Sequence, residues 1–381
     1  MLFKDIVGQA EVKEHLIQSV QQNRISHAQL FLAPEGSGGL ALAVAYGQYI
    51  SCENRSAEDS CNECSSCRKY NKLIHPDLHF SYPFFRGGEK EDALPDLDEW
   101  RDLLLSNPYF NLEKWRERLD AQNKQPNINK AECLHILRTL ALKPFESEFK
   151  TVIIWLPEFL RNEGNRLLKS LEEPSEKTLI ILVAEQQDQI LNTILSRTQL
   201  VKIPRLTFED ITGYLVHGKN ISEEKAKQLA YLSEGNLQTA LNLLEEEVND
   251  HFEMFASWLR NCYSDKGTQF IEFTEVASKF GRENQKSFLR YGINLIRESA
   301  MVMVGASELV HLHSAELDFI KNFSKVMNLS KAEAIISELE KAYYHIERNA
   351  NPKILFLDVS LQFVNILKHN TIPSGTHYIF S

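Results

Sequence analysis

The chain has 381 residues, of which 43% are hydrophobic and 25% are charged, and this is enough for two or three domains with cores of their own. Its formal net charge of −10 argues against a chain that binds nucleic acid by itself, because phosphate contacts require clustered Lys and Arg. No apolar run approaches the ~18 residues of a membrane span and the N-terminus lacks the layout of a signal peptide, so we expect a cytoplasmic protein.

The first part of the chain contains a loop of the kind that binds phosphate groups. An amphipathic helix around 12–20 and a short apolar strand around 30–32 precede the loop at 33–40, and a helix is expected over 40–50. In a working loop, backbone N–H groups at the helix N-terminus cradle the phosphates, a Lys neutralises them and a Ser or Thr helps to hold Mg²⁺. The glycine scaffold is present as Gly36 and Gly38, but the positions of the Lys and the hydroxyl residue are Gly39 and Leu40. An ordinary turn between strand and helix explains this pattern equally well.

Four of the six cysteines fall within sixteen residues, at Cys52, Cys61, Cys64 and Cys67. This spacing allows four thiolates to converge on one tetrahedral Zn²⁺, in a closed structural site with no position open for a substrate water. The alternatives are two small disulfides or a redox pair, both of which a reducing compartment disfavours.

A segment from about 84 to 127 interrupts the pattern with many aromatic and charged residues. Within it we expect helices near 97–106 and 112–122. We interpret the segment as an insertion on the surface of the domain. It is either helical decoration that packs its own aromatic residues or a surface on which a partner docks.

A strongly apolar strand is expected around 150–155, and the residues at its carboxyl end bear on whether the chain can hydrolyse nucleotide. In an active phosphate-loop ATPase, acids at this strand end complete the Mg²⁺ shell and orient the attacking water. Here Trp155 and Leu156 stand in those positions, and Glu158 follows only after a proline. Since an indole and an isobutyl group can do neither task, we predict a nucleotide-type fold that does not hydrolyse nucleotide.

Strands and helices alternate from about residue 128 to 205, which predicts an α/β domain with a parallel sheet covered by helices on both faces. The expected elements after the strand at 150–155 are a helix at 162–173, a strand at 178–183, a helix at 190–197 and a strand at 200–203. Beyond Pro204 the pattern is wholly helical, with helices at 208–217, at 222–233 (Ser222 as a plausible N-cap) and at 237–247. We therefore predict a domain over 1–205 that includes the cysteine module (52–67), a three-helix domain over 206–247 and a helical domain over 248–381.

Several segments together resemble the clamp-loader branch of the AAA+ ATPases, which serves bacterial DNA polymerase III. The similar segments, besides the cysteine module, are Phe3-Lys4-Asp5-Ile6-Val7-Gly8-Gln9, the run from Arg24 to Leu32, His75-Pro76-Asp77, the ten residues from Asn165 to Pro174, Leu195-Ser196-Arg197-Thr198, and Arg348-Asn349-Ala350-Asn351-Pro352. The resemblance covers about 1–83 and 128–370. It implies an AAA+ domain with a RecA-like parallel sheet, a small helical lid and a helical collar through which subunits assemble.

The resemblance also implies roles for single residues. Where active relatives place an arginine that senses the γ-phosphate, this chain has Gln238, so three functions of its own nucleotide site are lost. Arg197 matches the family's Ser-Arg-Cys arginine, although Thr198 replaces the cysteine. That arginine reaches the ATP of a neighbouring subunit as an arginine finger, a fixed cation against the charge that develops on the transferred phosphoryl group. The alternative is an ordinary arginine at a helix end, in a surface salt bridge.

The resemblance thus implies a non-enzymatic stator in a clamp-loader heteropentamer for DNA replication, with structural zinc and no functional ATP/Mg²⁺ site. Its expected partners are a motor ATPase subunit, the delta subunit, the sliding clamp and, through the complex, primer–template DNA. One rival is an active ATPase in which Lys150, Lys169 or Glu158 replaces the lost groups. The other is a zinc-dependent DNA-binding module, which the balanced charges around the cysteines disfavour.

Overall fold

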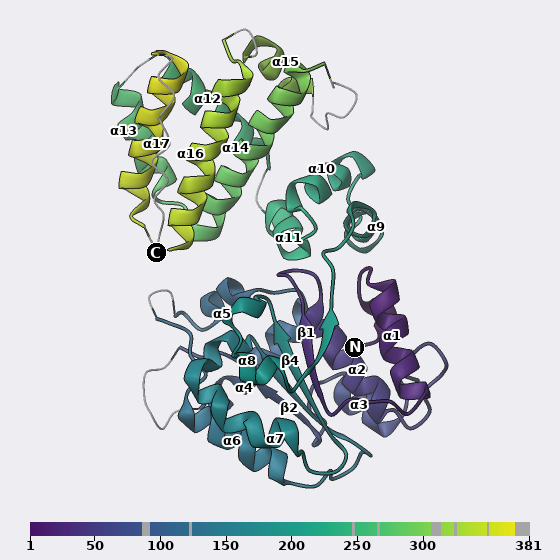
Figure 1. Cartoon of the computed structure of the whole chain (residues 1–381). Coiled ribbons are helices and arrows are strands. Elements are labelled where there is room, and N and C mark those ends of the chain that lie inside the picture. The colour runs from purple at the N-terminus through teal and green to yellow at the C-terminus, as the bar shows by residue number, and fades with distance from the viewer. Residues whose placement is uncertain are drawn as a thin grey trace. The chain divides into compact units, whose positions relative to one another are not determined.

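The structure is a computed structural model, shown in Figure 1, and it describes residues 1–85, 92–121, 124–245, 248–264, 267–305, 314–323, 326–348 and 350–369. The chain forms two compact units. The first comprises Met1–Ile221 with Gly235–Gln238, and the second comprises Ser222–Glu234 with Thr239–Ser381. The division at 205 and 247 stays a prediction, and residues 246–247 and Asn349 of the predicted helical domains lie outside the described residues.

A five-stranded parallel sheet lies at the centre of the first unit, in the order β2-β3-β4-β1-β5 (Figure 1). The strands are β1 (Ala28–Leu32), β2 (Leu78–Ser81), β3 (Lys150–Trp155), β4 (Thr178–Ala184) and β5 (Gln199–Lys202). β3 and β4 are buried along their whole length, which explains why they read as continuous apolar runs in the sequence.

Helices cover both faces of this sheet because successive strand residues point to opposite sides. On one face, Phe31, Ile153 and Val183 pack with α1 (Ala10–Gln21) and α2 (Gly39–Ser51). On the other, Leu30, Ile154 and Leu182 pack with a second set of helices. These are α6 (Lys130–Ala141), the 3-10 segment η3 (Pro157–Leu167), α7 (Leu168–Glu172) and α8 (Asn192–Leu195). With the helical part that follows, this confirms the predicted fold class.

The aromatic insertion is not a surface decoration, and that expectation was wrong for its described part. Its helices are α4 (Leu97–Ser106) and α5 (Leu112–Arg118), preceded by the short η2 (Leu94–Asp96). Trp100 and Trp115 are fully buried in the core cluster that includes α2 and the sheet. Trp100 stacks on Tyr82 with 4.1 Å between ring centroids and lies 5.2 Å from Trp155. Residues 86–91 and 122–123 of the insertion lie outside the described residues.

Helix lengths differ from the expectation in three places. The helix expected over 112–122 ends at Arg118, because Asp120 takes a left-handed φ of +48°. Of the helix expected over 162–173, residues 162–167 belong to the 3-10 segment η3 and only α7 is α-helical. The non-helical residue of η3 is Arg161, just before this span, where φ is +46° and ψ is −136°. The helix expected over 190–197 is the single turn α8. Ser222 does occupy the N-cap of α10 (Glu223–Ser233), but its side chain makes no capping hydrogen bond.

The described part of the second unit is all helical. Its helices are α10, most of α11 (Leu237–Glu245), α12 (Val248–Ser264), α13 (Gly267–Ala277), α14 (Arg282–Met303), α15 (Ser314–Phe323), α16 (Leu329–Glu347) and α17 (Pro352–Leu367). The helices α3 (Ser65–Tyr70) and α9 (Phe208–Lys219) belong to the first unit. Trp258 lies at the centre of its aromatic core, stacks on Phe273 and donates from Nε1 to Ser360 Oγ at 2.8 Å. Among the described residues, no helix has both the length and the apolar character needed to cross a membrane.

One lysine of the first unit lies inside the protein. Lys150 is only 1% exposed, and its ammonium group donates to the carbonyl oxygens of Thr139 at 2.9 Å, Leu140 at 2.8 Å and also Leu142. These carbonyls lie at the C-terminal end of α6, where backbone acceptors lack partners within the helix and where a cation is favoured. Lys150 therefore joins β3 to the end of α6.

We expect Lys150→Met to lower the stability of the first unit by about 2 kcal/mol, because buried carbonyl oxygens lose their donor. Urea unfolding followed by tryptophan fluorescence measures the change. The exposed Lys143→Met is the matched control and should leave the midpoint in place. Equal stability of Lys150→Met and the wild type would show that water replaces the ammonium group without cost.

Candidate nucleotide site and cysteine cluster

The phosphate-type loop and the end of β3 lie together at the carboxyl ends of the parallel strands. The Ala33 N–H donates to the Ala184 carbonyl at 2.8 Å, and the Leu156 N–H donates to the Val183 carbonyl at 2.9 Å. Both acceptors belong to β4, which lies between β1 and β3. The structure therefore brings together the two sets of altered residues that the sequence analysis selected.

The loop keeps the backbone of a phosphate loop but has no room for its lysine. Gly36 and Gly38 have φ angles of +70° and +89°, a left-handed conformation that favours glycine. Gly39 lies in the first turn of α2, and a Cβ atom there would come within 2.3 Å of the Ala33 Cβ. Leu40 is buried. A lysine at position 39 would thus require a shift of the strand end.

The end of β3 is apolar and closed. Trp155 and Leu156 are 4% and 3% exposed, and Leu156 adopts a φ of +52°, an uncommon backbone conformation for leucine. The nearby acid Glu158 is also buried, and its Oε1 accepts from the N–H groups of Glu185 at 2.7 Å and Gln186 at 2.8 Å. Burial raises the pKa of this carboxyl group. Glu158 therefore holds the loop after β4, while Lys150 is bound to α6.

Gln238 lies at the same carboxyl ends, and residues of the insertion join it. Gln238 is 1% exposed, and its Oε1 accepts from Asn107 Nδ2 at 2.6 Å. Tyr109 Oη accepts from the Val7 N–H at 2.8 Å, and Asn111 Nδ2 donates to Glu35 Oε1 at 3.1 Å. Asn236 donates to the same Glu35 oxygen at 3.0 Å. The sequence analysis selected none of the insertion residues Asn107, Tyr109 and Asn111 individually, and only the density of aromatic residues drew attention to this segment.

Arg197 follows α8 on the other side of the sheet. Its side chain is 31% exposed and forms an ion pair with Glu172, with Nε 2.5 Å from Glu172 Oε1. Nη1 also donates to the Thr193 carbonyl at 2.9 Å and to Ser196 Oγ at 3.1 Å. This geometry fits the surface salt bridge that was one alternative. It also leaves the guanidinium group partly accessible from outside the chain.

The four clustered cysteines converge. Their sulfur atoms all lie within 4.8 Å of one another, and the Cys52 and Cys61 sulfurs are 3.5 Å apart. Four sulfurs around one Zn²⁺ would be about 3.8 Å apart, whereas a disulfide requires about 2.05 Å. All six cysteines lie within the described ranges, and none of them forms a disulfide. The N–H groups of Cys61, Cys64 and Cys67 each donate to a sulfur of the cluster at 3.3–3.4 Å, which suits thiolate ligands. The donor set therefore fits a structural zinc ion.

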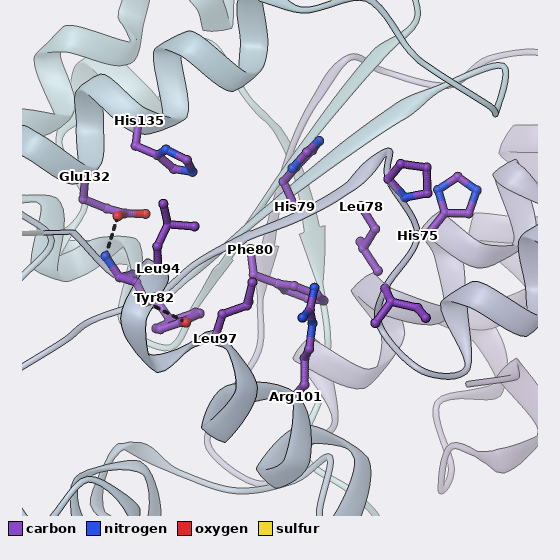
Figure 2. Close-up of a pocket in the computed structure, with 13 residues that line it drawn as sticks. His75, Leu78, His79, Phe80, Tyr82, Leu94, Leu97, Arg101, Glu132 and His135 are labelled. Carbon is purple, nitrogen blue, oxygen red and sulfur yellow. Dashed lines mark hydrogen bonds between the residues drawn. The ribbon is translucent and has the colours of Figure 1, made fainter.

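A separate pocket of about 210 Å³ lies beside β2 (Figure 2). It is lined by Ile74, His75, Pro76, Leu78, His79, Phe80, Tyr82, Ala93, Leu94, Leu97, Arg101, Glu132 and His135. Glu132 Oε2 accepts from the Ala93 N–H at 2.9 Å, and Tyr82 Oη donates to the Ala93 carbonyl at 3.0 Å. Among the described residues, its histidines and acid do not form a group that could hold a metal ion. No residue predicted for the nucleotide site or the cysteine cluster lines this pocket.

Comparison with known proteins gives the family of the chain. The family model described as "DNA polymerase III, delta subunit" matches residues 8–207. This range holds the whole parallel sheet, the phosphate-type loop, the cysteine cluster and Arg197. The chain belongs to this family.

Individual relatives are more distant. The chain is 26% identical over 253 residues to DNA polymerase III subunit gamma of Buchnera aphidicola (Acyrthosiphon pisum), over 65% of this chain and 59% of that protein. It is also 26% identical over 245 residues to subunit delta' of Bacillus subtilis, over 64% of this chain and 60% of that protein. The chain thus spans about three fifths of the length of these relatives. A solved structure titled as a Bacillus subtilis DNA clamp loader delta protein covers 92% of this chain and 99% of its own, with 12% identity and a TM-score of 0.32.

The cysteine geometry leads to a prediction about metal content. We expect the purified chain to hold one Zn²⁺, and Cys67→Ser to abolish zinc binding and lower the melting temperature by roughly 10 °C, since the cysteine module has little core of its own. Elemental analysis and thermal unfolding measure the two effects. Cys133→Ala, which removes a buried thiol outside the cluster, should leave the zinc content unchanged. A fully folded, metal-free protein would contradict a structural zinc site.

The pocket beside β2 gives a pH dependence. Burial, with the charge of Lys150 and the nearby His135 and His75, lowers the pKa of His79 to about 4, although Asp77 opposes this. In the unfolded chain the pKa is about 6.5, so the unfolded state binds more protons between pH 6.5 and 4 and stability falls as pH falls through this window.

Between pH 7 and pH 4.5, we therefore expect the free energy of unfolding of the wild type to fall by about 2 kcal/mol more than that of His79→Gln. Urea unfolding at a series of pH values measures this difference. The exposed His15→Gln is the matched control and should follow the wild type. Parallel curves for His79→Gln and the wild type would mean that His79 is protonated without cost in the folded protein.

Proposed function

We propose that the chain is a delta-prime-type subunit of a DNA polymerase III clamp loader, a stator that hydrolyses no nucleotide itself. The observation that carries this proposal is the end of β3, where buried Trp155 and Leu156 take the place of acids. No Mg²⁺ ligand and no base for water stand there. The lack of space for a lysine at Gly39 supports the same conclusion, because two independent parts of the catalytic machinery are missing at one site.

The rival proposal is an active ATPase with substitute residues, and the positions of these residues do not support it. Lys150 is buried and donates to the carbonyls of α6, and Glu158 binds backbone N–H groups after β4. Lys169 is exposed on α7, in a different element from the phosphate-type loop. Each of these groups therefore already has a structural role or lies on another element.

Arg197 is the residue that we propose to act on a neighbour. In the isolated chain Glu172 pairs with Arg197 and holds the guanidinium at the protein surface. On assembly, the phosphates of ATP bound to an adjacent motor subunit would compete with Glu172 for this fork of donors, since Arg binds carboxylate and phosphate by the same geometry. The zinc module is proposed as a rigid structural part. The delta subunit is a further proposed member of the cytoplasmic heteropentamer, and the sliding clamp and primer–template DNA are proposed partners of the assembled complex.

The proposal is tested by reconstitution with the motor and delta subunits, followed by ATP turnover in the presence of clamp and primed DNA. We expect no turnover by the chain alone. Arg197→Ala should lower the turnover that depends on this subunit by ~10³ or more, and Arg197→Lys should restore little of it, because a point charge cannot replace the planar fork.

Two control variants make this test specific. The exposed Arg138→Ala on α6 removes a positive charge elsewhere and should leave turnover intact. Glu172→Gln frees Arg197 from its ion pair and should also keep the stimulation. Normal turnover in an assembled complex that carries Arg197→Ala would mean that Arg197 only forms a surface salt bridge. Turnover by the chain alone would mean that the protein is an active ATPase.

A further inference from the structure

The connection between α4 and α5 is held rigidly at the nucleotide site. Asn107 caps the C-terminus of α4, and the Asn111 side chain caps the N-terminus of α5 by accepting from the Lys114 N–H at 3.0 Å. Both helices are fixed to the sheet by fully buried indoles, Trp100 in α4 and Trp115 in α5. The five residues between the helices therefore have little freedom to move away without disturbing this core.

Four of these five residues contact residues of the site. The Tyr109 ring lies over the phosphate-type loop, so close that a Cβ atom at Gly38 would be 3.0 Å from Tyr109 Cε1. The Tyr109 hydroxyl accepts from the Val7 N–H, and Asn107 donates to Gln238. The next ring, Phe110, lies 5.0 Å from the Trp155 ring at the end of β3. Tyr109 and Phe110 are each 5% exposed.

The connection also fixes a negative charge in the loop. Glu35 immediately precedes the first glycine, and its Oε1 accepts from both Asn111 Nδ2 and Asn236 Nδ2. The Leu237 N–H donates to the Gly36 carbonyl at 3.2 Å, so the chain around Asn236 also closes on the loop. A phosphate bound in this loop would lie near the Glu35 carboxylate, and with Gly39 in the lysine position no cation of the loop would offset the repulsion between these like charges.

We propose that the segment Asn107–Asn111 is a built-in occupant of the nucleotide pocket and excludes nucleotides from it by its volume and through the carboxylate that it holds. The pocket then has a resident ligand, which is a stretch of its own chain with an aromatic ring, a hydroxyl acceptor and two amides. This assigns a role to the aromatic insertion, and it does not depend on the role of Arg197.

The test is a titration of the full-length, zinc-loaded chain with a fluorescent ADP analogue in the presence of Mg²⁺. The wild type should show no saturable binding. The triple variant Asn107→Ala/Tyr109→Ala/Asn111→Ala should gain at least about tenfold in affinity, because the ring and both amides leave the pocket. The bound analogue should then slow hydrogen exchange at the Val7 N–H and in the loop.

Leu105→Ala, an exposed position of the same insertion, is the matched control and should behave like the wild type. Tryptophan fluorescence and thermal unfolding check that each variant is folded, and Tyr109→Ala alone replaces the triple variant if that one does not fold. Saturable binding by the wild type, or a folded opened variant that gains nothing, overturns the proposal. Neither result touches the Arg197 test, whose readout is turnover by another subunit.

Discussion

The first unit depends on the burial of one indole at the end of a strand. Trp155 stands at the carboxyl end of β3, where a parallel sheet normally exposes residues to a ligand. A side chain of this size must be covered, and the rings of Trp100 and Phe110 cover it. That contact fixes α4, and α4 in turn fixes the connection that lies over the loop. Trp155 at the strand end and the insertion that we propose to fill the site are thus parts of one aromatic cluster.

Local patterns predicted most of the first unit. The apolar runs of β3 and β4 and the strand–loop–helix around Gly36 depend on neighbours in the sequence, and the structure has them close to the expected bounds. The convergence of the four cysteines could be predicted for the same reason, since they fall within one short segment. The 3-10 form of residues 162–167 could not, because the apolar pattern of a short segment does not distinguish a 3-10 segment from an α-helix.

The contacts of the insertion lay beyond prediction because they join distant parts of the chain. Asn107 meets Gln238 across 131 residues, and Val7 meets Tyr109 across 102. A single sequence carries no record of such pairings, so the dense aromatic residues could only be interpreted as decoration or as a docking surface. The burial of charged side chains could not be predicted either. Lys150 and Glu158 look like available catalytic groups in the sequence, whereas both are bound to backbone atoms in the fold.

The closure of the loop by Asn236 has a consequence for how this protein is made. Glu35 and Asn236 are 201 residues apart, and a ribosome adds about 5–20 residues per second, so roughly 10–40 s pass between the synthesis of one and the other. During that interval Asn236 cannot yet donate to Glu35. The contacts that close the loop therefore form late, only after Gly235–Gln238 has been synthesised.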